Sequence, residues 1–140
     1  MRLTTAQAIV KYLIAQRTTD NSGAEVPLFP GVYGIFGHGN VTSLGHSLEM
    51  HRDEIPVWRG QNEQGMGLAA AAFAKAVRRQ QVMVATSSVG PGATNMITGA
   101  AVASVNRLPV LLLPGDIFAH RRPAPVLQQL EFPGSQDVSV

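Results

Sequence analysis

Short, almost uniformly apolar segments alternate along this chain with longer segments that have the apolar spacing of helices. The segments at residues 32–36, 81–86 and 109–113 lack the regular polar positions that a strand with one face in water would have. Helical patterns follow the first two, and parallel strands need such crossovers. The chain therefore predicts an α/β fold, with a doubly wound, mainly parallel sheet and helices on both faces.

The other elements are predicted from apolar spacing and turn residues. Thr4 and Gln7 have the spacing of a capping box at the start of a first helix over residues 4–16. The polar segment 18–30, which contains glycine and prolines, is expected to be a surface loop. The first helix is expected to bury one apolar face: Ala8, Ile9, Tyr12 and Leu13. The remaining expected elements are a brief strand at 56–58 and helices at 41–48, 62–78 and 93–106.

Composition excludes several classes of protein. The 140 residues are 45% hydrophobic and 14% charged, which suits one globular domain. The absence of cysteine excludes disulfides, a thiolate nucleophile and Cys-ligated metal sites. The net charge of +2 comes from scattered arginines, so we expect no nucleic-acid partner. The longest apolar stretch, 68–74, is too short to span a membrane and no signal pattern is visible, so we expect a soluble, cytoplasmic protein.

Polar and glycine-rich loops follow the expected strands, where ligands bind in open α/β sheets. Two of these loops resemble nucleotide-binding turns, but neither Gly37-His38-Gly39 nor Gly90-Pro91-Gly92 continues into the full G-x-G-x-x-G pattern. Both turns can still present backbone N–H groups to a polar ligand, or be plain turns. The candidate site therefore consists of four loops: residues 37–40, 60–63, 87–92 and 115–116.

Two residue types in these loops can carry acid–base or nucleophilic chemistry. Ser88 lies in a turn that differs from a nucleophile elbow because Thr86 replaces the first glycine, and Asp116 and His120 could complete a triad. A serine hydrolase is therefore one alternative. His38, between two glycines, can exchange protons at neutral pH or be an ordinary loop histidine bonded to backbone. The spacing of the histidines predicts no metal site.

Glu63 occupies the first turn of an otherwise apolar, alanine-rich helix. The helix dipole favours its negative charge, whereas the apolar neighbours would desolvate it. By itself this glutamate could be an ordinary acid at a helix N-terminus. The alanine-rich segment 68–76 permits close approach of another helix, either from the same fold or from a second subunit.

Three segments together resemble a known family. They are Asn-Glu-Gln-Gly-Met with the alanines after it (62–74), Thr-Ser-Ser-Val-Gly-Pro-Gly-Ala-Thr-Asn (86–95) and Pro-Val-Leu-Leu-Leu-Pro-Gly-Asp (109–116). In order and spacing they resemble the pyrimidine-binding domain of thiamine-diphosphate-dependent enzymes of the acetolactate synthase type. The resemblance implies such a domain at residues 1–117, with 118–140 as its end or the start of a linker that is cut short.

The resemblance also implies roles for individual residues. Glu63 would hydrogen-bond the aminopyrimidine ring of thiamine diphosphate and help remove the thiazolium C2 proton, after which the cofactor carbon attacks a substrate carbonyl. His38 would act on the substrate oxygen or on water, so the catalytic residues would be Glu63 and His38. The residues that would bind the cofactor are Glu63, Gly39, Asn40, Ser88, Pro91 and Asn95.

A narrower likeness within this family rests on residues 34–40, 59–66 and 125–131. It implies a hydrolase of inositol catabolism that cleaves a ring carbon–carbon bond of a polyhydroxylated cyclic diketone. The alternatives are another thiamine-diphosphate enzyme, such as an acetolactate synthase-like lyase or transferase, and a non-catalytic α/β binding or oligomerisation module.

The resemblance finally implies components outside this chain. Family members hold the diphosphate through Mg²⁺ with a Gly-Asp-Gly…Asn motif in a separate domain, whereas here Gly115-Asp116 is followed by Ile117. We therefore expect no metal ligand in this chain, and Mg²⁺ bound by a domain that the chain lacks. We further expect a second subunit of a homo-oligomer, and a fragment that is inactive by itself.

Overall fold

Four parallel strands form the centre of the structure, a computed structural model that describes residues 2–116. The order across the sheet is β4-β3-β5-β6, with every neighbouring pair parallel. The strands are β3 (Val32–Ile35), β4 (Val57–Arg59), β5 (Val84–Ser87) and β6 (Leu111–Pro114). The predicted α/β fold with a parallel sheet is confirmed. The expected domain end at residues 118–140 lies outside the described residues.

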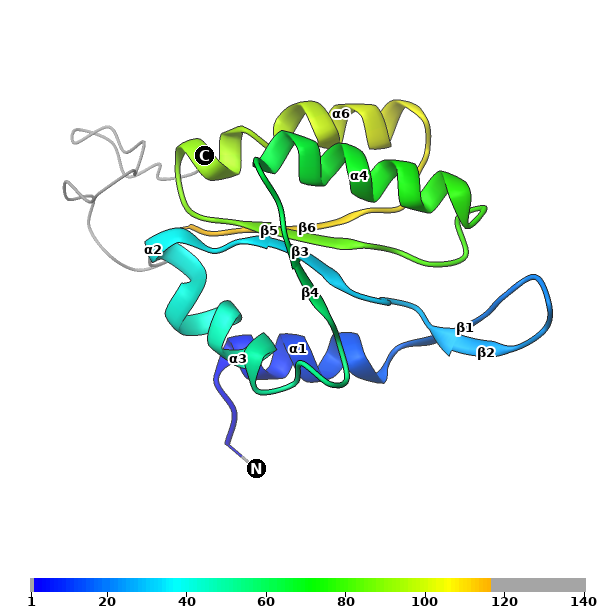
Figure 1. Cartoon of the computed structure of the whole chain (residues 1–140), viewed down its shortest axis with the longest axis horizontal. Coiled ribbons are helices and arrows are strands. Elements are labelled where there is room, and N and C mark those ends of the chain that lie inside the picture. Colours follow the sequence, from blue (N-terminus) through cyan, green and yellow to red (C-terminus); the bar gives the residue numbers. More distant parts are fainter. Residues whose placement is uncertain (1, 117–140) are drawn as a thin grey trace.

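Helices cover both faces of this sheet (Figure 1). One layer contains α4 and α6 with the short α5, and the other contains α1 with a segment of short helices before β4. In chain order the helices are α1 (Thr5–Ala15), α2 (Gly37–Asn40), the π-helix η1 (Val41–Gly45), α3 (His46–Glu49), α4 (Glu63–Ala76), α5 (Pro91–Thr94) and α6 (Ile97–Val105). Within residues 2–116, no helix is both long enough and apolar enough to cross a membrane.

The core has two parts, one on each face of the sheet. Val84 of β5 belongs to the larger cluster, which lies between the sheet and the layer of α1 and α3. Its neighbour Ala85 belongs to the smaller cluster, together with Met66 and Met96. Successive residues of a strand point to opposite faces, so one strand supplies both clusters. All four residues of β5 are buried, as the apolar run 81–86 predicted, although the strand begins three residues later than expected.

The predicted capping box of α1 is confirmed, but the predicted apolar face is wrong in part. Val10 and Leu13 are the buried residues of this helix. Tyr12 is 61% exposed, and Ala8 is exposed as well. Apolar residues occupy both 8–10 and 12–14, so helical spacing alone fits two overlapping faces. Ile9 and Ile14, which pack against the larger cluster, show which face the sheet selects.

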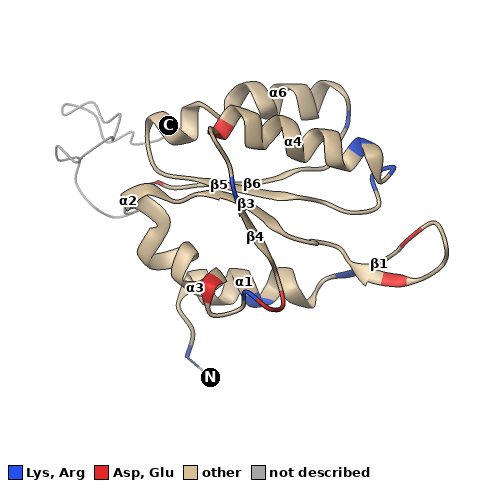
Figure 2. Cartoon of the chain, viewed as in Figure 1, with Lys and Arg blue, Asp and Glu red and all other residues tan. Residues whose placement is uncertain are grey.

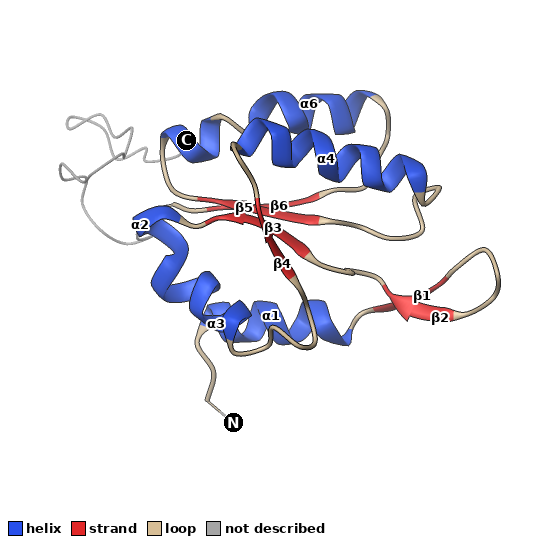
Figure 3. Cartoon of the chain, in the orientation of Figure 1, coloured by secondary structure: helices blue, strands red, loops and turns tan. Residues whose placement is uncertain are grey.

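The expected surface loop at 18–30 is in part a β-hairpin. Strands β1 (Arg17–Thr19) and β2 (Glu25–Pro27) pair antiparallel and form a separate two-stranded sheet (Figure 3). Their residues are exposed or half-buried and mostly polar, so they lack the apolar alternation by which strands are recognised.

Two helices predicted as continuous are each divided. The predicted helix 41–48 forms η1 and α3, and the predicted helix 93–106 is interrupted between α5 and α6. At the second interruption the Asn95 side chain bonds Glu63 of another helix. Tertiary contacts of this kind are invisible to helical periodicity. The expected loop at 37–40 is itself the short helix α2, since its two glycines do not prevent one helical turn.

Replacing Thr4 with alanine is expected to lower the free energy of unfolding by about 1 kcal/mol. The Thr4 hydroxyl accepts the N–H of Gln7, and the Gln7 side chain accepts the N–H of Thr4, at 3.2 and 3.0 Å. The change removes the first of these bonds. Urea unfolding followed by circular dichroism measures the effect. Thr98→Ala, on an exposed helical surface, is the control. Equal stability of Thr4→Ala and the parent chain would contradict the prediction.

Asp20 is expected to titrate below the ordinary range of an aspartate. The hydrogen bond from the Ser22 hydroxyl, at 2.6 Å, lowers its pKa most, and bonds from the backbone N–H groups of Ala24 and Ser22 lower it further from 3.8. Because folding lowers the pKa of Asp20, its ionised carboxylate stabilises the folded chain. This stabilisation is complete above pH 3.8 and is lost as the pH falls below that value. An NMR titration of the carboxyl carbon measures the pKa, which Ser22→Ala should raise. An unchanged value in that variant would be the contrary result.

Candidate functional site

A pocket of about 640 Å³ opens at the carboxyl ends of β3 and β5, beside the start of α4. This is the edge of the sheet at which the predicted loops were expected to meet. The pocket is lined by Ile35, Gly37, Glu63, Ser88, Pro91, Gly92, Thr94 and Asn95. The fold therefore brings together Glu63, Ser88, Pro91 and Asn95, which come from distant parts of the sequence.

Glu63 is the first residue of α4 and is half-buried at the pocket wall. Asn62 caps this helix, because its Oδ1 accepts the N–H of Gly65 at 2.7 Å. The Glu63 Oε2 accepts a hydrogen bond from Asn95 Nδ2 at 2.9 Å. Charged residues are few along α4 and α6, apart from an acid at the start of α4 and basic residues near the far end (Figure 2). The N-terminal end of the helix dipole favours a carboxylate at this position.

Two glycines allow the loops to approach the Glu63 side of the pocket closely. A Cβ on Gly92 would lie 3.2 Å from Glu63 Oε1, so the carboxylate fits against this backbone. Gly37 has a φ of +51°, and a Cβ there would lie 2.6 Å from the Cβ of Ser88. A side chain at either position would displace the wall of the pocket.

The Ser88 hydroxyl is buried and has no hydrogen-bond partner within residues 2–116. A buried polar group without a partner is costly, and such a group at a pocket wall suits a ligand that supplies the missing bond. Because no histidine bonds this hydroxyl, nothing in the described part of the chain activates it as a nucleophile. His120, the base considered for a serine hydrolase, lies outside the described residues.

The first glycine-rich loop lies against the second. Asn40 Nδ2 donates to the Ser87 carbonyl at 2.7 Å and is 3.3 Å from Thr86 Oγ1. The same carbonyl accepts the N–H of Gly115 at 3.0 Å. A Cβ on Gly39 would lie 2.9 Å from Val89 Cγ1. Asn40 therefore ties the first loop to the ends of β5 and β6.

His38, Gly39 and Asn40 do not line the pocket that contains Glu63. His38 is exposed at the start of α2. The Asn40 amide is engaged within the fold, and His38 lies on the surface of α2. The predicted roles of these three residues therefore stay predictions.

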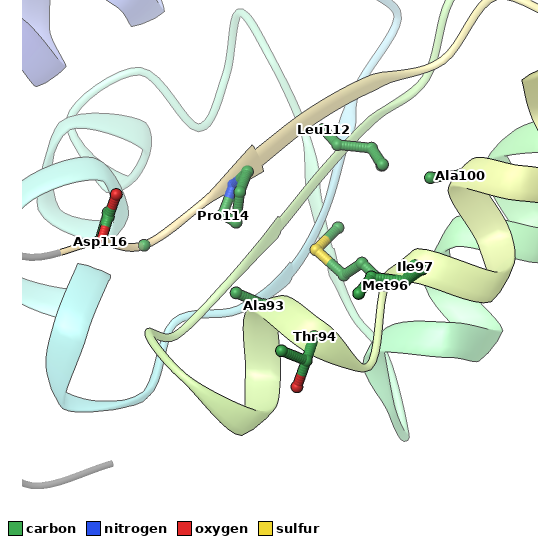
Figure 4. A pocket seen from close by; sticks show the side chains of 9 residues that line it. Ala93, Thr94, Met96, Ile97, Ala100, Leu112, Pro114 and Asp116 are labelled. Carbon is green, nitrogen blue, oxygen red and sulfur yellow. The ribbon is translucent and has the colours of Figure 1, made fainter. Parts of the chain in front are cut away.

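Two further hollows adjoin the Glu63 pocket. An apolar pocket of about 320 Å³ shares Thr94 with it, and there the side chains of Met96 and Leu112 lie between the helices and β6 (Figure 4). A hollow of about 460 Å³ at the end of β4 is lined by Ile35, Arg59, Gly60 and Gln61. Gln61 belongs to the predicted site loop 60–63, whereas Arg59 was not predicted as a site residue, although its place just before that loop was a usable signal.

Metal ligands are not grouped in this part of the molecule. Across residues 2–116, no cluster of three or more His, Asp or Glu side chains could hold a metal ion. The described residues thus provide a carboxylate, a buried hydroxyl and close backbone, which suit an organic ligand with polar ring atoms.

The fold and this site define a class of domain, a parallel α/β sheet with a polar pocket at the carboxyl ends of its strands. Residues 30–135 match the sequence model of a family described as thiamine pyrophosphate enzyme, N-terminal TPP binding domain. The chain belongs to this family, and the family resemblance found in the sequence is confirmed.

Curated relatives make the comparison more specific. Over 131 residues, 94% of this chain, it is 56% identical to 3D-(3,5/4)-trihydroxycyclohexane-1,2-dione hydrolase 1 of Bacillus cereus. Over its whole length it is 55% identical to 3D-(3,5/4)-trihydroxycyclohexane-1,2-dione hydrolase of Geobacillus thermodenitrificans, and it is 56% identical over 131 residues to the same-named protein of Bacillus thuringiensis. The chain covers 20–21% of the length of these relatives.

Proposed function

We propose that this chain supplies the pyrimidine-binding side of the active site in a thiamine-diphosphate-dependent hydrolase of 3D-(3,5/4)-trihydroxycyclohexane-1,2-dione. The observation that carries the proposal is the Glu63 carboxylate, fixed by Asn95 at the wall of a pocket that also contains the buried Ser88 hydroxyl. The 55–56% identity to hydrolases of that name supports the substrate.

The residues at this pocket fit one side of the cofactor. Glu63 Oε1 would share a proton with a ring nitrogen, since Oε2 is already engaged by Asn95. The Ser88 hydroxyl would donate to, or accept from, a polar atom of the same ring. Pro91 and Gly92 would form a close wall against the ring face. When bound, thiamine diphosphate supplies a nucleophilic carbon and an electron sink for cleavage of the ring bond.

The rest of the proposal concerns the complete protein. His38, at the rim of the first loop, would assist the substrate oxygen or the attacking water, and Gly39 and Asn40 would shape that loop beside the cofactor. Mg²⁺ would be bound outside residues 2–116. A second subunit, a cytoplasmic location and a role in inositol catabolism complete the proposed function.

A reaction assay with a full-length protein that contains this chain tests the proposal. The purified protein would be incubated with thiamine diphosphate, Mg²⁺ and the cyclic dione, and ring opening would be followed by mass spectrometry as the gain of one water. We expect hydrolysis that requires the cofactor. An intact dione together with cofactor-dependent condensation of two 2-oxoacids would favour an acetolactate synthase-like activity, and no cofactor binding would favour a non-catalytic module.

A further inference from the structure

The hydrogen bond between Asn95 and Glu63 joins residues that are 32 positions apart. We infer that Asn95 is a positioning residue that acts through Glu63, and that a glycine contact between α4 and α6 holds it in register. The inference rests on the proposed function, because it concerns the proton that Glu63 is proposed to share.

The two carboxylate oxygens of Glu63 have different surroundings. Oε2 accepts the Asn95 amide at 2.9 Å. Oε1 lies beside Gly92, 3.2 Å from the position that a Cβ there would take. The Asn95 amide thus holds Oε2, while Oε1 lies beside the Gly92 backbone at the pocket wall. A carboxylate held in this way needs no rotamer search before it meets a ligand atom.

Helices α4 and α6 cross with their backbones in contact at Gly67 and Gly99. A Cβ on Gly99 would lie 2.8 Å from the Cα of Gly67 and 2.9 Å from its carbonyl carbon. A Cβ on Gly67 would lie 3.1 Å from the Cα of Gly99. The atoms in the way are backbone, so a side chain at Gly99 can be accommodated only if the helices separate.

This crossing lies one helical turn away from the hydrogen bond on both helices. Gly67 follows Glu63 by four residues on α4, and Gly99 follows Asn95 by four. Asn95 has φ −66° and ψ −13°, and Met96 has φ −81° and ψ −14°, so the backbone from Asn95 into α6 is right-handed helical. Residues four apart lie on the same side of a helix. The Gly67–Gly99 contact therefore sets the separation at which the Asn95 amide meets Glu63.

Two changes should consequently weaken the same step by different routes. Asn95→Ala removes the donor, and Gly99→Ala moves the donor away from Glu63 while leaving the amide in place. In a full-length protein that contains this chain, we expect each variant to lower kcat by roughly 10- to 100-fold, the effect of a small displacement of a catalytic group. The KM for the dione should change little. Thr98→Ala, an exposed neighbour on α6, is the control and should behave as the parent.

A second readout separates positioning from a general structural role. The exchange of the thiazolium C2 proton for deuterium in bound thiamine diphosphate, followed by NMR after acid quench, reports proton removal without substrate. We expect this rate to fall in parallel with kcat in both variants, whereas the Kd for thiamine diphosphate changes by less than about threefold. Asn95→Gln, which keeps an amide donor at an exposed position, should recover part of the rate. Unchanged exchange in Asn95→Ala would overturn the inference, even if Gly99→Ala fails to fold.

A double-mutant cycle tests whether Asn95 acts through Glu63. If it does, adding Asn95→Ala to Glu63→Gln changes the exchange rate little further, because the group that Asn95 positions is already lost. If the double variant lost the product of the two single-variant reductions in exchange rate, the inference would be contradicted. The exchange assay does not use the dione. If the parent protein failed to hydrolyse the dione but the variants still slowed C2 proton exchange, only the proposed substrate would be refuted. Normal hydrolysis with unaffected exchange in Asn95→Ala refutes only the role of Asn95.

Discussion

Glu63→Gln should abolish most of the activity of a full-length protein containing this chain, by 10²-fold or more, while the domain stays folded. Loss of a general acid–base group typically costs about 10²–10⁴-fold. Glutamine has the shape of glutamate and keeps an oxygen that can accept from Asn95, so packing around α4 should be preserved. What it loses is the ionisable oxygen that would share a proton with the cofactor. Steady-state turnover of the dione measures the effect.

Two controls make the Glu63 result interpretable. Glu25→Gln changes an acid of the hairpin, where its carboxylate pairs with Arg17 at 3.3 Å, far from the pocket in sequence and on a separate sheet. This variant should turn over as the parent does. Circular dichroism should show that both variants are folded. Parent-like turnover of Glu63→Gln would refute the catalytic role of this residue and, with it, the central part of the proposed function.

Leu48→Ala should reduce the free energy of unfolding by about 2–5 kcal/mol, the cost of truncating a buried leucine. Leu48 is 1% exposed and belongs to the core cluster beneath the sheet, with Val10, Leu13 and Val32. The change leaves a cavity between α3, α1 and the sheet, and the short helix α3 has few other buried residues with which to close it.

Urea unfolding of the chain, followed by circular dichroism, measures the Leu48 effect. Leu3→Ala is the matched control, since Leu3 is 42% exposed and its truncation should cost within about 0.5 kcal/mol. If both variants lost the same stability, the placement of Leu48 in the core would be wrong.

The sequence predicted well those features that depend on local chemistry. The apolar run at 81–86 predicted a strand buried on both faces, and β5 is buried throughout. The spacing of Thr4 and Gln7 predicted a capping box that the structure contains. Glu63, at the start of an alanine-rich helix, was placed at the candidate site, and the structure places it at the pocket wall. In each case a few neighbouring residues determine the outcome.

Features that depend on contacts between distant segments could not be predicted in this way. The hairpin of β1 and β2 carries mostly polar residues, so no alternation marks it. The Gly67–Gly99 crossing involves glycines that, in sequence, only weaken a helical pattern. The hydrogen bond from the Asn40 amide to the Ser87 carbonyl joins residues 47 positions apart, and that partner exists only in the folded chain.

The carbonyl oxygen of Ser87 accepts both the Asn40 amide and the N–H of Gly115. Three segments that border the site therefore meet at a single atom. An opening fluctuation of the first loop, or of the end of β6, has to give up a hydrogen bond at this oxygen, which lies in the most buried strand of the sheet. Both segments are thereby anchored to the central strand, and local unfolding of either one costs at least the hydrogen bond that it makes there.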